Sequence, residues 1–124
     1  MLSRNDFVTK RELERVKVDV PERGDSVYVR KLLANEWASY EQGCVSDQEA
    51  GRPVLYKVRL VVVSACDEKG NRLFNDADVI VVSKMTEAAV INRIFEAAIA
   101  LNQMSAAGIA EAEKNSDSAP SPVS

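Results

Sequence analysis

The chain has 124 residues and a formal net charge of −3, and 46% of its residues are hydrophobic. This is enough for one domain with a single core. Its charges are mixed: residues 1–31 carry eight basic and six acidic side chains, and residues 75–124 carry three and seven. A nucleic-acid-binding protein would need a clustered basic face, so we predict no nucleic-acid partner. No apolar run approaches the length of a membrane span, and Arg4 and Asp6 interrupt any signal-like start, so we expect an intracellular protein.

The residues that usually carry catalysis or bind metals are scarce. The chain has no His, and its two cysteines, Cys44 and Cys66, stand 22 residues apart. These residues cannot supply a typical zinc site, and no serine lies in a nucleophile motif. The acidic stretch 67–71 has the wrong spacing of oxygen donors for a calcium loop, and a turn explains it more simply. We therefore predict that the protein is not an enzyme and has no catalytic residues, no cofactor and no metal.

A β-hairpin is predicted near the start of the chain, after a polar segment (residues 1–15) that we interpret as an arm or a marginal helix. Valines alternate with polar residues over 16–20 and again over 27–30, which is typical of strands with one buried face. Pro21 fixes its backbone and ends the first strand, and Gly24 can take the positive φ of a return turn. Asn35 then stands where the cap of a helix through Gln42 belongs. The residues from Gln42 to Arg52 contain two glycines and several polar residues, and they predict a loop.

The segment from Pro53 to Cys66 admits two interpretations. Val54, Tyr56 and Val58 alternate with charged residues, and β-branched side chains favour a strand. Pro53, however, suits the first turn of a helix, and apolar residues also recur at helical spacing. If the segment were a strand, residues 67–71 would form a hairpin loop and residues 72–74 its partner strand.

The last predicted helix has one continuous apolar stripe. Asp76 is the expected cap of a short helix over about 77–84, and Thr86 and Glu87 open the final helix, where Glu87 lies at the positive end of the dipole. The stripe contains Val90, Leu101 and Met104 together with four residues that we select as candidate partner contacts, Ile91, Ile94, Phe95 and Ala98. Such a stripe is usually core. It is also large for the core of a small monomer, which favours an additional contact with a partner. Residues 105–124 are rich in Ala, Ser, Pro and acidic residues and predict a disordered tail.

The order of these elements resembles the tail assembly chaperones of long-tailed bacteriophages. The residues that carry the resemblance are a valine-rich strand, a Pro-Glu-x-Gly turn (21–24), a second strand of the V-x-V-R type (27–30), the apolar segment 60–66, an Asp-Glu-x-Gly turn (67–70) and a Leu-Phe pair (73–74). Arg23 departs from the aromatic or Gly often found in that turn. The resemblance spans roughly residues 2–116 and implies that the segment from Pro53 to Cys66 is helical. The expected fold is α+β: a small domain over 16–104, with an N-terminal β-hairpin packed on three to four helices.

The resemblance also implies a function and its partners. Such a chaperone binds the tape measure protein, keeps it soluble during tail assembly and presents it to the major tail protein, and it can form homo-oligomers. It acts in the host cytoplasm and is absent from the mature virion. A frameshift-extended form is also implied, and Glu113-Lys114-Asn115 can be encoded by a slippery run. The alternatives are a structural tail or head-tail connector protein retained in the virion and, less favoured, a small host regulatory or antitoxin-like module.

Overall fold

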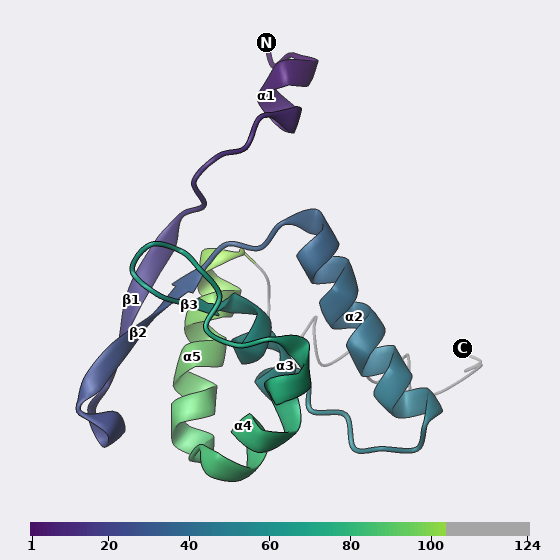
Figure 1. Cartoon of the computed structure of the whole chain (residues 1–124), viewed down its shortest axis with the longest axis vertical. Helices are drawn as coiled ribbons and strands as arrows, with labels where there is room; N and C mark the ends of the chain where they lie inside the picture. The colour runs from purple at the N-terminus through teal and green to yellow at the C-terminus, as the bar shows by residue number, and fades with distance from the viewer. Residues whose placement is uncertain (104–124) are drawn as a thin grey trace.

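The computed structural model describes residues 1–103, and within them it has the predicted α+β architecture (Figure 1). A three-stranded antiparallel sheet in the order β1-β2-β3 lies beside a group of helices. Along the chain the elements are α1 (Arg4–Val8), β1 (Arg15–Val20), the 3-10 helix η1 (Pro21–Arg23), β2 (Asp25–Arg30), α2 (Ala34–Glu49), α3 (Tyr56–Ser64), β3 (Ala65–Cys66), the 3-10 helix η2 (Asp76–Asp78), α4 (Val79–Met85) and α5 (Ala88–Leu101). The expected tail and Met104 lie outside the described residues.

Helix α3 is the centre of the core. Four of its nine residues are valine, a composition that intrinsic preference assigns to strands. Leu60, Val61, Val62 and Val63 are all buried, because α2, α4 and α5 contact α3 and cover successive sides of it. Burial of this apolar surface therefore outweighs the weak helix propensity of the segment.

The two interpretations of the segment from Pro53 to Cys66 each describe part of it. The helical expectation is confirmed over Tyr56–Ser64, although Pro53 precedes the helix rather than lying in its first turn. Directly after the helix, Ala65 and Cys66 pair with β2 as the short strand β3. Residues 67–71 then form a turn that returns the chain, and Arg72 forms a β-bridge with Cys66. The backbone changes from helical to extended at this point. There it pairs with the edge of β2 that faces away from β1.

The predicted hairpin is confirmed, and the structure adds its register. Strands β1 and β2 pair antiparallel from Arg15 opposite Arg30 to Val20 opposite Asp25. Pro21 begins η1, and Gly24 closes the turn with a φ of 69°, which a residue with a Cβ rarely adopts. Helix α5 contacts both strands and covers the buried valines of the hairpin.

Helix α2 is longer than predicted, and the expected loop over 42–52 is wrong. The helix continues to Glu49 because Cys44 and Asp47 extend its buried face, and the connecting segment starts only at Ala50. Gly43 lies inside this helix because a side chain would not fit there: a Cβ would lie 2.8 Å from Nη1 of Arg59. A glycine that makes room for a neighbour inside a helix was misinterpreted as a loop signal.

Two predicted helix caps are displaced by one or two residues. Helix α2 starts at Ala34, and its first turn is held by Glu36, whose carboxylate accepts a hydrogen bond from the Leu33 N–H at 2.9 Å. The residue that caps η2 is Asn75, whose Oδ1 accepts from the Ala77 N–H at 2.9 Å. Asp76 instead pairs with Arg72. The last helix begins within one residue of its predicted start: Glu87 is its N-cap residue and Ala88 its first residue, whereas Thr86 is the C-cap residue of α4.

The buried position of α3 gives a stability prediction. Leu60→Ala should destabilise the fold by about 2–5 kcal/mol, because it removes fully buried methyl groups from a helix packed on several sides. Ile80→Ala makes a similar truncation on α4 at a half-exposed position and should change the free energy of unfolding by less than about 0.5 kcal/mol. Urea unfolding followed by circular dichroism measures both. Equal losses would contradict the assignment of α3 as the core.

Candidate functional site

An apolar groove opens between the tip of the hairpin and the helices α4 and α5. Its volume is about 360 Å³. We call it the hairpin groove. One wall of the groove comes from β2 and η1, and the other from α4 and the start of α5. Residues of α3 together with Phe74 form its floor. The lining residues are Val20, Arg23, Asp25, Ser26, Val27, Val61, Ala65, Phe74, Val81, Val82, Met85, Thr86, Val90, Ile91 and Ile94.

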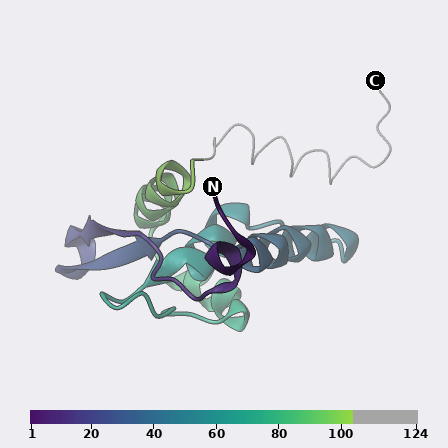
Figure 2. The same cartoon turned by 90° about the horizontal axis from the view of Figure 1, so that it is seen from above.

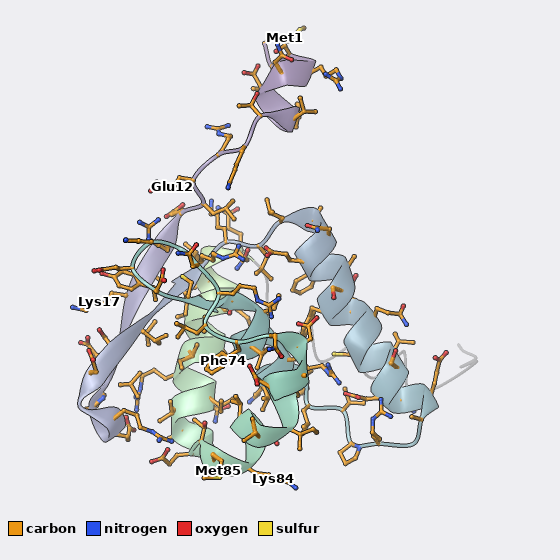
Figure 3. The ribbon with its side chains drawn as sticks, in the orientation of Figure 1. Met1, Glu12, Lys17, Phe74, Lys84 and Met85 are labelled. Atoms are coloured by element: carbon orange, nitrogen blue, oxygen red, sulfur yellow. The ribbon has the colours of Figure 1, made fainter. Side chains whose placement is uncertain are left out.

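The interior of the groove is almost entirely aliphatic. Its deepest residues, including Val61, Val82 and Val90, belong to the buried core. At the mouth, Val81 and Met85 of α4 are 52% and 69% exposed. Figure 3 shows Met85 at the outer end of α4, away from the N-terminal arm. Apolar side chains therefore continue from the core to the surface, an arrangement typical of sites that bind apolar segments of a partner.

Two arginine–glutamate ion pairs hold the hairpin tip against the helices and so fix the width of the groove. Arg23 donates to the Met85 carbonyl oxygen at 2.8 Å and to Oε1 of Glu87 at 2.9 Å. Arg93 of α5 donates two bonds of 2.8 Å to the two carboxylate oxygens of Glu22. The hydrogen bonds from Arg93 lower the pKa of Glu22 from its usual 4.5 to about 2.

The four candidate partner contacts do not share one environment. Ile91 and Ile94 line the hairpin groove, although both side chains are largely buried. Phe95 and Ala98 lie deeper in the core, where Phe95 is 1% exposed and packs edge-on against Tyr56 with 5.7 Å between ring centroids. All four residues thus serve the core, and their contact with a partner stays a prediction.

Sequence reasoning missed the residues at the mouth of the groove. Val81 was placed in a short helix over about 77–84 with no surface role, and Met85 was given no role at all. A signal was available: residues 79–82 are four consecutive apolar residues, and a helix packed on one side cannot bury all of them. In the structure Val79 and Val82 are buried, whereas Ile80 and Val81 are exposed.

A second polar cluster ties α2 to α3. Arg59 donates to both carboxylate oxygens of buried Asp47, with both distances 2.7 Å, and Arg52 adds a weaker bond. Burial alone would raise the pKa of Asp47, but the hydrogen bonds and positive charge of the two arginines outweigh it, and the pKa lies below its usual value. Because every charged group here has a close partner, the cluster is structural.

A third polar cluster links β2 to the start of α2. Arg30 donates two bonds, of 2.9 and 2.6 Å, to the carboxylate of Glu36. Glu36 also accepts from the N–H of Leu33, so one side chain orders the helix start and neutralises a buried arginine.

The described residues present no arrangement suited to catalysis or metal binding. Over residues 1–103 no three His, Cys, Asp or Glu side chains gather as possible metal ligands. Burial raises the pKa of the Cys66 thiol, which disfavours the reactive thiolate. The Asp67 carboxylate accepts from the backbone N–H groups of Lys69 and Asn71 in its own turn. In this part of the chain, no helix is long and apolar enough to cross a membrane.

Comparison with known proteins identifies the family. Residues 8–115 match the family model described as phage tail assembly chaperone, and the chain belongs to that family. The fold is similar to the solved structure of the bacteriophage HK97 tail assembly chaperone, with a TM-score of 0.59. That alignment covers 77% of this chain and 88% of the other at 21% identity, which supports a shared fold. Comparison with curated protein sequences gives no match.

The pair of Glu22 and Arg93 gives a prediction for acid stability. Because folding lowers the pKa of Glu22 from 4.5 to about 2, the pair stabilises the fold above pH 4.5, and this stabilisation is lost as the pH falls toward 2. Wild-type Tm should therefore fall more steeply over this interval than the Tm of Glu22→Gln. Glu41→Gln, at an exposed position of α2, should keep the wild-type slope. Parallel curves for wild type and Glu22→Gln would contradict the assignment.

Proposed function

We propose that the protein binds the tape measure protein during phage tail assembly and keeps its apolar segments soluble. The observation that carries the proposal is an open apolar groove on a member of the tail assembly chaperone family. A long helical partner presents apolar stripes that would aggregate in water before assembly. A groove with an aliphatic interior and a charged border covers such a stripe without requiring one particular sequence.

The charged border of the groove suits a transient contact. Arg23 and Asp25 line the groove, Lys84 lies nearby on α4, and all three are exposed. Charges at the edge of an interface steer association and limit aggregation, whereas the apolar interior supplies most of the binding free energy. A chaperone must release its client, so moderate affinity is an advantage in this role.

The remaining parts of the proposal follow the family. The protein would act in the host cytoplasm through binding rather than catalysis, present its client to the major tail protein, and be absent from the mature virion. A frameshift-extended minority product would carry a C-terminal extension. The competing function, a structural tail or connector protein, differs in one observable: mass spectrometry of purified virions would then detect this chain in stoichiometric amounts.

Co-expression tests the proposal. The tape measure protein from the same phage should be insoluble alone and soluble when produced with this chain, and the two should co-purify. Val81→Asp introduces a charge at the mouth of the groove, where the side chain is half-exposed, so it should reduce the recovered soluble complex by tenfold or more without unfolding the protein.

Leu73→Asp is the matched control, because Leu73 has a similar exposure but does not line the groove. It should leave the yield of complex unchanged. Thermal unfolding of both variants checks that their folds are intact. If the tape measure protein stays insoluble with wild type and with the frameshift-extended form, the proposed function is wrong. If Val81→Asp retains full activity, the groove is not the binding surface.

A further inference from the structure

The outer edge of strand β1 has no neighbour within the described chain. The sheet order β1-β2-β3 places β1 at an edge, and the hairpin projects to one side of the helices in both views (Figures 1 and 2). The Glu14 carbonyl oxygen accepts a bond from the Lys31 N–H at 2.9 Å, so this pair is hydrogen-bonded across the hairpin. Because such pairs alternate along an antiparallel ladder, the backbone groups of Arg15, Lys17 and Asp19 are directed to the outer edge.

The charges on this edge are self-complementary for one register. When two copies of β1 pair antiparallel about Val18, Lys17 of each copy lies opposite Asp19 of the other. A shift of the second strand by two residues in one direction would place Lys17 opposite Lys17 and Arg15 opposite Asp19, and in the other direction it would place Asp19 opposite Asp19. Of these three registers, only the one centred on Val18 has opposite charges facing each other and no like-charged pair. Opposite charges facing each other across a strand pair are favourable and like charges are unfavourable. Charge therefore selects the register centred on Val18.

From this pattern we infer that two copies of the protein form a symmetric dimer by antiparallel pairing of their β1 edges, with Lys17 of each copy opposite Asp19 of the other. Each of the two pairs of Lys17 and Asp19 exchanges two backbone hydrogen bonds, and the two three-stranded sheets join into one of six strands. Pro21 ends the ladder on each side, because it has no N–H.

The surroundings of the edge leave room for this contact. The side chains of Lys17 and Asp19 are exposed, and Figure 3 shows Lys17 pointing away from the body of the molecule. Arg93 reaches the Asp19 carbonyl oxygen at 3.4 Å, a long bond that leaves the second lone pair of this oxygen available.

The N-terminal arm supplies an independent argument for the same dimer. Phe7 and Val8 are 75% and 57% exposed, and α1 stands clear of the body (Figure 1). In the antiparallel dimer, the arm that precedes β1 continues past Pro21 of the second copy, beside the mouth of that copy's hairpin groove. The six residues between Val8 and Arg15 span roughly 20 Å when extended, enough for Phe7 to reach this apolar surface. The dimer thus gives the uncovered arm a place to pack.

Charge reversal tests the dimer on the full chain alone, without any client. Lys17→Asp places acidic residues opposite each other in both pairs, and Asp19→Lys places lysines opposite each other. Each single variant should raise the dimer Kd at least tenfold, as measured by sedimentation velocity over a concentration series. An equimolar mixture of the two variants should form a heterodimer with an affinity near that of wild type, because every opposing pair then has opposite charges.

The double variant Lys17→Asp/Asp19→Lys should recover the wild-type homodimer. Its composition equals that of wild type, so recovery cannot be explained by net charge. Leu73→Ser, at an exposed apolar position away from the edge and the arm, should leave the Kd unchanged, whereas Phe7→Ser should raise it. These variants change exposed side chains, and thermal unfolding checks that the monomer fold is intact.

Two results would overturn the inference. One is a wild-type chain that stays monomeric at every concentration tested. The other is a dimer whose Kd is the same for wild type, both single variants and their mixture. Neither result would affect the proposed function, which is measured by the solubility of the tape measure protein. Conversely, a dimer that responds to charge reversal stands even if no client is bound.

Discussion

The rest of the structure depends on the burial of one short helix. Helix α3 is nine residues long and rich in valine, so it would not persist alone in water. It forms because α2, α4 and α5 all contact it and remove its apolar surface from solvent. The same constraint locates the sheet, because the chain leaves α3 directly into β3 and pairs with β2. Packing α2 against α3 also buries the carboxylate of Asp47. The ion pair with Arg59 of α3 compensates this buried charge and so links the two helices.

Local signals predicted some elements of this fold well and others poorly, for identifiable reasons. The hairpin was predictable because its determinants are local: alternating valines, Pro21 at the turn and Gly24 at the positive φ. The length of α2 was not, because Gly43 serves a distant partner, the guanidinium of Arg59. The short β3 was equally inaccessible, since two residues carry no periodicity and their pairing depends on the edge of β2. For α3, residue preference favoured a strand, and only tertiary packing makes it a helix.

The candidate site shows a similar division. The stripe on α5 was correctly predicted as apolar, and Ile91 and Ile94 do line the hairpin groove. The other half of the groove comes from η1, β2 and α4, which are far apart in the sequence and meet only because Arg23 and Arg93 tie the hairpin tip to the helices. A groove made by two ion pairs and three separate segments leaves no motif in the sequence. Periodicity therefore identifies which residues are apolar, but not which of them remain reachable from solvent.

An open apolar groove carries a risk of nonspecific association, and the N-terminal arm would reduce this risk in the proposed dimer. Exposed aliphatic side chains at the mouth of the groove promote nonspecific association, and an unpaired strand edge does the same. Pairing of two β1 edges would remove the edge from solvent and bring each arm beside the groove of the other copy. An arm held there by a few apolar contacts would shield the groove, yet a client with a longer apolar stripe would displace it, because it buries more surface. In the proposed dimer, the bare edge, the uncovered arm and the open groove of one copy would each be covered by the other copy.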